Sequence, residues 1–428
     1  MVWEPGVYGK NFGFVATRFA GTDGVSLEAA KWAEVIWRHQ HITFWCAGKL
    51  DRDPEISLLI PEAHFEHPEN QWINTQIYGT HLRSRACTGR IHRLRKTIKA
   101  KLYEFLDKFK IDVLVVENCL TIPMHIPLAL ALTEIIAETS IPTIAHHHDF
   151  YWERDRFTIN AVPEYIQMAF PPRLPSIQHV VINSAAQEQL AYRTGIVSTV
   201  IPNVLDFNAP PPQVDTYAST FREDIGLSPQ DVLILQPTRV VSRKGIEHAI
   251  DLVRRLGDPK YKLVVSHEAG DEGLEYQHFL LDYAASLGVD MRIVNRKVGE
   301  KREQDRELGK RYTLWDVYPH ADLVTYPSLY EGFGNAFLEA IYFRKPLLVN
   351  RYSIYIRDIE PKGFRVVEMN GYLTKEVVEE VRYILENEEH RREIVDHNFE
   401  LGRRYYSFNV LERLLGNLVS NIFGLSAG

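Results

Sequence analysis

The segment ADLVTYPSLYEGFGNAFLEA, from Ala321 to Ala340, combines an apolar run, two glycines and two glutamates. Its first eight residues form a short apolar run that is typical of a buried strand, and the residues from Asn335 onward have helical spacing. Gly332 and Gly334 therefore lie at a strand-to-helix turn. Such a turn lets the backbone approach a ligand, and the helix N-terminus offers free N–H groups to a phosphate. The stretch predicts an α/β unit with a ligand at the end of a strand.

Two acidic side chains bracket this turn. Glu331 precedes it, nearer to whatever the phosphates carry, and Glu339 lies one helical turn after Asn335, which we expect to cap the helix. On that face, the Glu339 carboxylate can accept hydrogen bonds from a pair of sugar hydroxyls. Taken alone, the pattern also fits an ordinary connection without a ligand.

A basic turn, TRVVSRKG at residues 238–245, follows another apolar run. Arg239 and Lys244 stand five positions apart, and a helical pattern begins after Gly245. A guanidinium and an ammonium at a strand end can neutralise a diphosphate, including the charge that builds as it leaves. An exposed basic turn is the alternative, but two such turns at strand ends of one sheet favour a shared site.

Short apolar runs alternate with helix-length amphipathic stretches along most of the chain. The expected strands are residues 12–19, 41–48, 112–118, 142–148, 179–184, 231–239, 261–268, 290–296, 321–328 and 345–351, with helices at 26–39, 91–110 and 126–138 among them. This alternation indicates βαβ units and parallel sheets covered on both faces. Residues 201–220, with prolines at 210–212, are expected to be a linker, and residues 296–311 a solvated loop or helix.

Composition restricts the class of protein. The chain has 428 residues, is 45% hydrophobic and 25% charged, and carries a formal net charge of -7. These values are typical of a globular protein of two or three domains and argue against a general nucleic-acid binder. The 3 cysteines have no paired spacing, which argues against a disulfide framework or a zinc site. Without an apolar signal core or membrane-length run, we expect a cytoplasmic protein.

Together, these features resemble the family 4 retaining glycosyltransferases with the GT-B fold. Glu331 and Glu339 within EGFGNAFLEA resemble the family's EX7E element, and TRVVSRKG resembles its arginine–lysine phosphate motif. Three further segments are similar: VIPNVLDF (200–207) to the end of the first domain, GTDGVSLEAA (21–30) to the first glycine loop, and IPTIAHHHDF (141–150) to the histidine-bearing strand. The likeness spans nearly the whole chain in the family's order.

The resemblance implies an α/β fold of the GT-B type, with two Rossmann-like domains whose parallel sheets face a central cleft. The expected parts are an acceptor-binding domain over residues 1–205, a nucleotide-sugar-binding domain over 206–404, and a C-terminal helix over 405–428 that crosses back to the first domain. In such sheets, ligands bind beyond the carboxyl ends of the strands.

The resemblance also implies residue roles. On the donor side, Arg239 and Lys244 bind the diphosphate, and Glu339 binds the ribose. Glu331 contacts and orients the transferred sugar, and the backbone of Phe333, Gly334 and Asn335 contacts the sugar and phosphates. The loop with Gly21, Asp23 and Gly24 lies on the acceptor side. Asn335 and Ala336 depart from the small apolar or proline residues of the family, and Thr22-Asp23 stand between the loop's glycines. The sugar and acceptor therefore stay open.

Three consecutive histidines end the strand expected at residues 142–148. His146 and His148 share one face of a strand while His147 points the other way, and the resemblance places a histidine here beside the transferred sugar. Three interpretations stay open: a catalytic sugar contact by His148 or His146, a packed structural cluster, and a metal site, for which adjacent strand residues converge poorly. Glu117 and Asn118, which end the neighbouring strand, are candidates for the same pocket.

Three polar stretches carry weaker signals. Residues 51–53, DRD, match the metal-binding pattern of another glycosyltransferase fold but lie outside the expected donor domain. With Arg239 and Lys244 as cations, we expect no required metal and no cofactor. Residues 151–157 can bind a polar acceptor or form a solvated loop edge. Residues 81–101 hold eight Lys or Arg and no acid, which fits a solvated helix, an anionic acceptor or an anionic membrane surface, the last not favoured.

The resemblance thus implies a retaining hexosyltransferase whose catalytic residues are Glu331, His148, Arg239 and Lys244. It moves a hexose from a UDP- or GDP-hexose to a hydroxyl of a small polar acceptor, such as a sugar, a sugar phosphate or a glycerate-like acid. The alternatives are transfer to a membrane lipid or polysaccharide and a GT-B-type nucleotide-sugar epimerase. The sequence does not identify the donor base, the hexose, the acceptor, the linkage or the oligomeric state.

Overall fold

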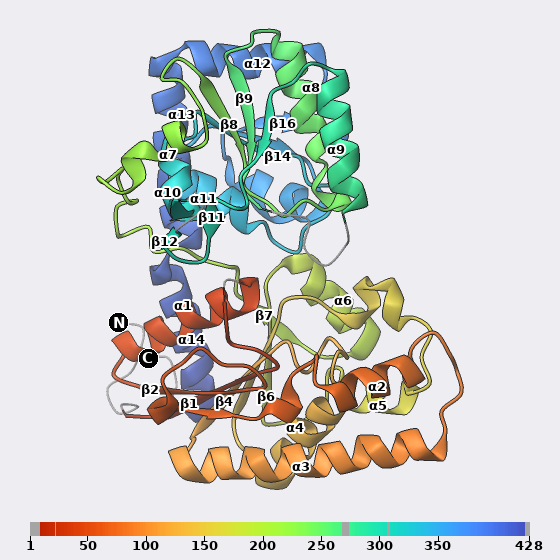
Figure 1. The fold of residues 1–428 in the computed structure, drawn as a ribbon. Coiled ribbons are helices and arrows are strands. Elements are labelled where there is room, and N and C mark those ends of the chain that lie inside the picture. The colour runs from red at the N-terminus through yellow and green to blue at the C-terminus, as the bar shows by residue number, and fades with distance from the viewer. Residues whose placement is uncertain (1–8, 22, 268–273, 306–308, 424–428) are drawn as a thin grey trace. The chain divides into compact units, whose positions relative to one another are not determined.

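A computed structural model describes residues 9–21, 23–267, 274–305 and 309–423 (Figure 1). The chain divides into two compact units, one made of Met1–Asn203 with Phe408–Gly428 and the other of Val204–Ser407. Each unit contains a parallel sheet with helices on its faces. This arrangement confirms the predicted α/β fold class with two Rossmann-like domains.

The first unit has a seven-stranded sheet in the order β3-β2-β1-β4-β5-β6-β7, and its neighbouring strands are parallel. The strands are β1 (Asn11–Ala16), β2 (Ile42–Ala47), β3 (Ser57–Leu59), β4 (Val113–Glu117), β5 (Thr143–His147), β6 (Ile177–Val181) and β7 (Ser198–Val200). The helices are α1 (Gly24–Arg38), α2 (Pro68–Ile77), α3 (Arg85–Phe109), α4 (Ile126–Thr139), α5 (Pro163–Ala169), α6 (Ser184–Thr194) and α14 (Phe408–Phe423).

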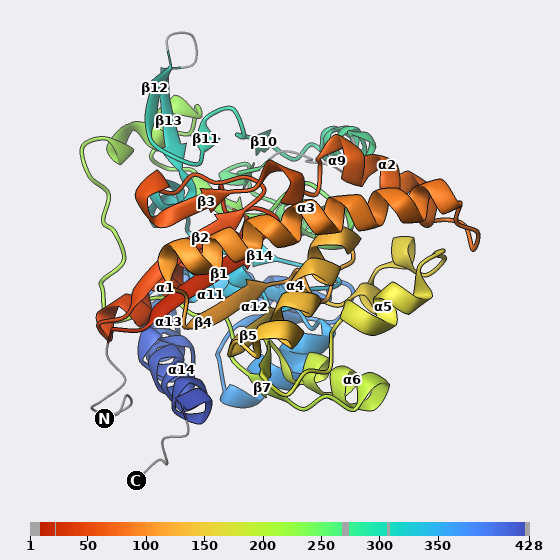
Figure 2. The same ribbon diagram turned by 90° about the horizontal axis from the view of Figure 1, so that it is seen from below.

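Strand alternation assigns the helices of the first unit to two faces of its sheet. Leu114 and Val116 of β4 lie in one core with the buried residues of α3 and α4, and Figure 2 shows α3 running along that side. On β5, Ala145 belongs to this core, whereas His146 stacks on Trp32 of α1 with ring centroids 4.2 Å apart. Successive strand residues point to opposite faces, so α1 covers the other side.

The second unit has a six-stranded parallel sheet in the order β10-β9-β8-β14-β15-β16. Its strands are β8 (Val232–Gln236), β9 (Tyr261–Val265), β10 (Met291–Ile293), β14 (Leu323–Tyr326), β15 (Leu347–Asn350) and β16 (Val367–Met369). Its helices are α7 (Phe221–Asp224), α8 (Ile246–Leu256), α9 (Glu275–Ser286), α10 (Leu314–Val317), α11 (Asn335–Tyr342), α12 (Lys375–Glu386) and α13 (Glu388–Tyr406). Buried residues of α8, α9 and α12 share one core with the sheet.

The charged segment at residues 296–311 corrects a prediction. We expected a solvated loop or helix, but the segment contributes to a small sheet of β11 (Val298–Gly299), β12 (Glu303–Asp305) and β13 (Gly309–Thr313). The Tyr217 hydroxyl lies 2.7 Å from the Glu303 carbonyl oxygen and 2.9 Å from that of Arg311. The antiparallel pair is thus fixed by a contact distant in sequence, which local charge patterning does not reveal.

The C-terminal segment is divided at Ser407, where α13 ends and α14 begins. Within the first unit, α14 packs against α1: the Arg38 guanidinium lies 5.0 Å from the centre of the Phe408 ring, and His39 Nε2 lies 2.6 Å from a Glu412 carboxylate oxygen. Among the described residues, no helix is both long and apolar enough to cross a membrane.

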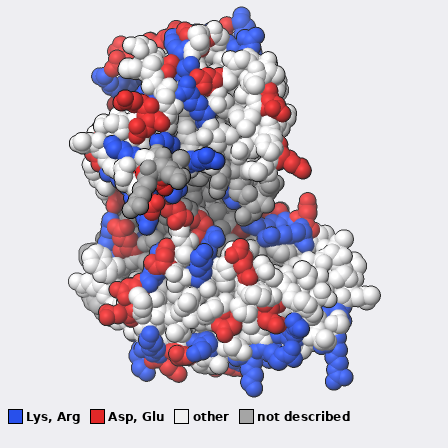
Figure 3. All heavy atoms as spheres, viewed as in Figure 1, with Lys and Arg blue, Asp and Glu red and all other residues white. Residues whose placement is uncertain are grey.

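The basic segment at residues 81–101 lies mostly on α3. Figure 3 shows Lys and Arg side chains along the lower margin, where α3 runs in Figure 1. Five of its cations form ion pairs with acids, namely Arg83, Arg90, Arg95, Lys99 and Lys101. Much of the positive charge that the sequence concentrates here is therefore balanced by acids of neighbouring helices and, for Lys101, of α3 itself.

Candidate functional site

Two loops lie against each other at the carboxyl edge of the second sheet. β8 and β14 are parallel neighbours, so the loops that follow them leave at the same edge. The Leu329 N–H donates a hydrogen bond of 2.8 Å to the Arg243 carbonyl. Gly245 has φ +60°, and a Cβ atom there would come within 2.6 Å of the Pro327 carbonyl oxygen. Glycine is needed at this approach, and the expectation that both turns share one edge is confirmed.

Lys244 and Glu331 form a buried ion pair at this edge. Lys244 Nζ contacts Glu331 Oε1, and each residue is 8% exposed. Arg243 Nη1 adds a second cation 3.4 Å from Glu331 Oε2. Beneath them, Lys244 Nζ lies 5.5 Å from the centre of the Tyr326 ring. The two loops therefore present a compact group of two cations and one anion.

Burial and pairing act in opposite directions on this ion pair. Burial lowers the pKa of Lys244, and the Glu331 charge only partly opposes that shift. Burial also disfavours ionisation of Glu331, but the Lys244 ammonium outweighs it and holds the Glu331 pKa below its usual value. Each charge is maintained by the other, so a ligand that attracts one of them also releases its partner.

Arg239 acts on this pair through its charge, which adds to the lowering of the Lys244 pKa. Its residue is exposed, and within the described ranges no hydrogen bond or ion pair engages its guanidinium. Arg243 was not predicted as a site residue, yet it contacts Glu331 from the short 3-10 turn Ser242–Lys244. The two adjacent basic residues in SRKG could have suggested Arg243. How each of them approaches Glu331, however, depends on the conformation of that turn.

The glycine turn before α11 is held by tyrosine. Gly334 has φ +122°, and a Cβ atom there would lie 2.4 Å from the Tyr352 hydroxyl oxygen. That hydroxyl donates to the Phe333 carbonyl at 2.7 Å, and Phe333 itself is buried. Asn335 was predicted as the N-cap, but Gly334 is the cap and Asn335 is the first helical residue. Because Gly334 takes the capping position with a positive φ, the helix begins one residue earlier than the capping preference of asparagine predicted.

Glu339 lies on α11, one turn into the helix. Its Oε2 accepts a hydrogen bond of 2.7 Å from the Tyr318 hydroxyl. The Tyr318 ring is buried and stacks on Phe343 with a centroid distance of 4.8 Å. Tyr318 thus fixes one carboxylate oxygen of Glu339 on a rigid aromatic support.

In the first unit, the ends of β4 and β5 are joined by a polar network. Asn118 has φ +59°, and its amide group donates to Asp149 at 2.9 Å and accepts from the His148 backbone N–H at 3.0 Å. Arg154 Nε donates to the other Asp149 oxygen at 2.6 Å. The left-handed conformation of Asn118 turns its side chain across the strand ends, which ties the two loops together.

The three histidines take the faces expected from strand alternation. His148 Nε2 lies 3.0 Å from Glu117 Oε2, and His146 Nδ1 lies 3.0 Å from the same oxygen. His147 points the other way, and its Nε2 is 2.9 Å from His179 Nδ1. The sequence-based prediction about these faces is confirmed.

The environment assigns different charges to these groups. Burial would raise the pKa of Glu117, but the two histidines beside it lower that pKa to about 2. Burial disfavours a charge on His148, yet the hydrogen bond and charge of Glu117 raise its pKa. Burial lowers the pKa of both His146 and His147. Glu117 is therefore ionised near neutral pH, with His148 as the favoured site of the positive charge.

Glu117, His146 and His148 form the one group in the described part of the chain that could converge on a metal ion, with candidate ligand atoms within 4.8 Å of one another. A metal-bound histidine usually donates its second ring nitrogen to a partner. His146 Nε2 is buried and has no hydrogen-bond partner among the residues described. The arrangement fits hydrogen bonds within the group better than metal coordination.

The first glycine loop is braced by acidic side chains. The Gly21 N–H donates to Asp51 at 2.9 Å, so part of the DRD stretch supports this loop. Asp23 caps α1 by accepting from the N–H groups of Val25 and Ser26, each at 3.2 Å. Gly24 is the first residue of that helix. Asp23 therefore has a clear structural role at the position where the sequence placed an acceptor loop.

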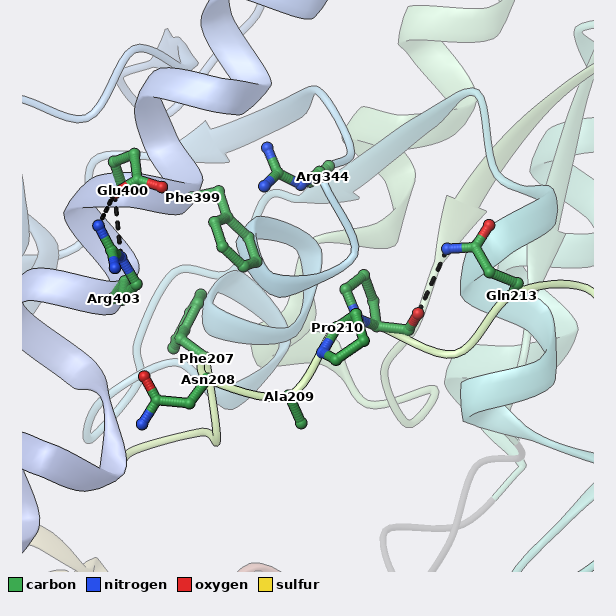
Figure 4. A pocket seen from close by; sticks show the side chains of 10 residues that line it. Phe207, Asn208, Ala209, Pro210, Gln213, Arg344, Phe399, Glu400 and Arg403 are labelled. Carbon is green, nitrogen blue, oxygen red and sulfur yellow. Dashed lines mark hydrogen bonds and ion pairs between the residues drawn. The ribbon is translucent and has the colours of Figure 1, made fainter.

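A groove of about 540 Å³ lies elsewhere in the second unit (Figure 4). It is lined by Phe207, Asn208, Ala209, Pro210, Pro211, Gln213, Arg344, Phe399, Glu400 and Arg403. The Arg344 guanidinium lies 3.8 Å from the centre of the Phe399 ring. None of the predicted site residues lines this groove, so the groove is distinct from the site at the strand edge.

Comparison with known proteins adds an independent finding. The sequence model of the family described as "Glycosyl transferases group 1" matches residues 218–400. The chain is 33% identical over 386 residues to a mannosylglucosylglycerate synthase of Petrotoga mobilis, a match that covers 84% of this chain and 86% of that protein. It is 32% identical over 431 residues to a mannosylglucosylglycerate synthase of Thermotoga maritima, with coverages of 93% and 96%.

A solved structure shares the fold. The chain is similar to a glycosyltransferase from Rickettsia africae, with a TM-score of 0.70 and 13% sequence identity, over 98% of this chain and 100% of that one. At this identity, the likeness concerns the arrangement of helices and strands.

Proposed function

The chain belongs to the group 1 glycosyl transferases, and from that premise we propose that it transfers a mannosyl unit from a nucleoside diphosphate mannose to a hydroxyl of glucosylglycerate. The observation that carries the reaction type is the buried Lys244–Glu331 pair, with Arg239 exposed nearby in the chain, at the carboxyl edge of the second sheet. Cations at such an edge suit a diphosphate.

Donor binding would rearrange this pair. The diphosphate attracts Lys244 and Arg239, and Lys244 then turns away from Glu331. The released carboxylate can accept hydrogen bonds from the hydroxyls of the transferred sugar, while Glu339, held by Tyr318, binds the ribose. The backbone around Phe333, Gly334 and Asn335 completes the donor site.

The proposed reaction retains the configuration of the anomeric carbon. The bond between that carbon and the diphosphate oxygen breaks, and the acceptor oxygen bonds to the same face. The acceptor proton passes to the leaving diphosphate, whose charge Lys244 and Arg239 neutralise. Glu331 orients the sugar and forms no covalent bond. These two cations supply the charge that a metal would otherwise provide, so we propose no required metal.

The acceptor assignment rests on the two similar proteins. Their name describes a product with mannosyl, glucosyl and glycerate parts, and one glycosyl transfer can complete it by adding the mannosyl part to glucosylglycerate. The acceptor-side groups that we propose are His148 and Asn118 with the loop of Gly21, Asp23 and Gly24, whereas His146 is fully buried and supports this edge through Glu117.

A turnover panel tests this function. The purified protein is incubated, with a chelator present, with GDP-, UDP- and ADP-hexoses and with glucosylglycerate, glycerate or no acceptor. We expect one mannosyl donor to release nucleoside diphosphate, with release rising when glucosylglycerate is added. Lys244→Met should lose this activity, whereas Lys375→Met, whose side chain is 79% exposed on α12, should keep it.

Other outcomes would replace the proposal. Conversion of the donor into an isomer without any acceptor would indicate an epimerase. Transfer only when lipid or polysaccharide is supplied would move the acceptor to that class. Activity that disappears with chelator and returns with a divalent cation would contradict the metal-independent mechanism.

A further inference from the structure

We propose that Glu117 is a positioning residue that holds His148 as an imidazolium, so that its second ring nitrogen is presented at the end of β5 as a charged hydrogen-bond donor. The inference deepens the proposed function, because His148 lies on the edge to which we assign the acceptor. It stands on the contacts of the ring and on the charge balance of the buried group around it.

Glu117 is a buried carboxylate that contacts two histidine rings. Glu117 is 1% exposed, and its Oε2 lies 3.0 Å from both His148 Nε2 and His146 Nδ1. A buried carboxylate is costly unless a cation and hydrogen bonds accompany it. The two rings that touch it each have to donate a proton to it, so both contacting nitrogens carry hydrogen.

The surroundings of the two rings differ, and they determine which ring carries the positive charge. His146 is fully buried, stacks on Trp32, and has a ring nitrogen, Nε2, without a hydrogen-bond partner among the described residues. A proton on that nitrogen would be buried and unpaired, so the neutral ring with hydrogen on Nδ1 is favoured. The cation that balances Glu117 is therefore His148, whose side chain is 12% exposed.

The other charged groups near His148 support the same assignment. Glu28 of α1 and Asp149 of the following loop both favour a charged His148, and the neighbouring His146 is kept neutral by its burial. Glu28 is itself paired with Lys31 at 2.8 Å and Asp149 with Arg154, so Glu117 is the acid in direct contact with the ring. These influences raise the pKa of His148.

The consequence concerns substrate chemistry. With Nε2 held by Glu117, Nδ1 of His148 is the nitrogen that can donate to a ligand, and no hydrogen bond to it is found within the described ranges. A charged donor favours an anionic or strongly accepting oxygen, such as the carboxylate of a glycerate group. A neutral histidine at this position would discriminate less between a carboxylate and a hydroxyl.

Nuclear magnetic resonance of the full chain with isotope-labelled histidine tests the proposal without any substrate. The signal of His148, assigned by its loss in His148→Gln, should titrate above the ordinary histidine value of 6.5. In Glu117→Gln the pKa of His148 should fall, because the carboxylate that stabilises its positive charge is gone. Glu28→Gln is the matched control, because it removes a nearby carboxylate that does not touch the ring, and its shift should be smaller.

Kinetics provide the second readout. Glu117→Gln should raise KM for glucosylglycerate more than it lowers kcat. The variant should also show a smaller preference for glucosylglycerate over the uncharged glucosylglycerol. Its affinity for glucosylglycerate should recover as the pH falls. A His148 that is neutral near pH 7 in the wild type, or stoichiometric bound metal that is lost in His148→Gln, would overturn the proposal. Because the titration needs no turnover, a failure of the proposed reaction and a failure of this inference can be told apart.

Discussion

At the scale of single residues, the Lys244–Glu331 pair concentrates the donor chemistry. Lys244 and Glu331, residues that are each 8% exposed, hold an ammonium and a carboxylate in direct contact. Removing one partner of such a pair leaves an uncompensated buried charge, which costs far more than a surface pair. A test of function at this position therefore has to separate ligand binding from stability.

Lys244→Met and the double variant Lys244→Met/Glu331→Gln provide that separation. We expect Lys244→Met to weaken binding of the nucleoside diphosphate by about ten- to a hundredfold, because a charged hydrogen bond to the phosphates is lost, and to lower the melting temperature. The double variant removes both charges, so it should regain much of the stability and none of the affinity. Calorimetric titration and thermal unfolding measure the two effects. Unchanged affinity in Lys244→Met would remove it from the donor site.

At the scale of elements, the turn before α11 depends on glycine for two separate reasons. Gly334 has φ +122°, and a Cβ atom there would meet the Tyr352 hydroxyl oxygen. Gly371 also has a positive φ of +80°, but nothing lies within 4 Å of a Cβ built there. Both positions need a positive φ, but only at Gly334 would an added Cβ atom collide with another side chain.

Gly334→Ala should therefore be more harmful than Gly371→Ala. Backbone strain alone costs about 1–2 kcal/mol, which both variants should show in chemical denaturation. Gly334→Ala should in addition push Tyr352 away from the Phe333 carbonyl and reduce donor affinity. Equal stabilities and equal affinities in the two variants would contradict the assigned role of the turn.

Two buried histidines, His147 on β5 and His179 on β6, make the stability of the fold depend on pH. His147 and His179 are buried against each other, and burial lowers the His147 pKa and takes the His179 pKa to about 4. Because the folded values lie below the ordinary 6.5, the unfolded chain binds more protons between pH 6.5 and about 4. The stabilising contribution is present above 6.5 and is lost as the pH falls through that window.

We expect the melting temperature to fall as the pH is lowered from 6.5 toward 4, and His179→Gln to flatten that decline. The comparison with wild type removes the contributions of the other titrating groups. An identical slope in the variant would mean that this pair is not a source of the acid sensitivity.

At the scale of the whole molecule, the sequence determines the strand-and-helix alternation better than the details of either site. Continuous apolar runs predicted the strands that lead into the loops of Lys244, Glu331 and His148, because a strand buried on both faces leaves a strong local signal. The contact of Arg243 with Glu331 and the braces from Tyr352 and Tyr318 were not predicted. They depend on packing between segments far apart in the chain, as does the antiparallel pair fixed by Tyr217.

We propose that this group 1 glycosyl transferase transfers a mannosyl unit onto a glycerate-bearing sugar with retention of configuration. The most direct measurement is a nuclear magnetic resonance spectrum of the product formed from nucleoside diphosphate mannose and glucosylglycerate with chelator present. We expect a new mannosyl linkage on glucosylglycerate with the same anomeric configuration as the donor. A product of inverted configuration, or donor consumed without any linkage to the acceptor, would contradict it.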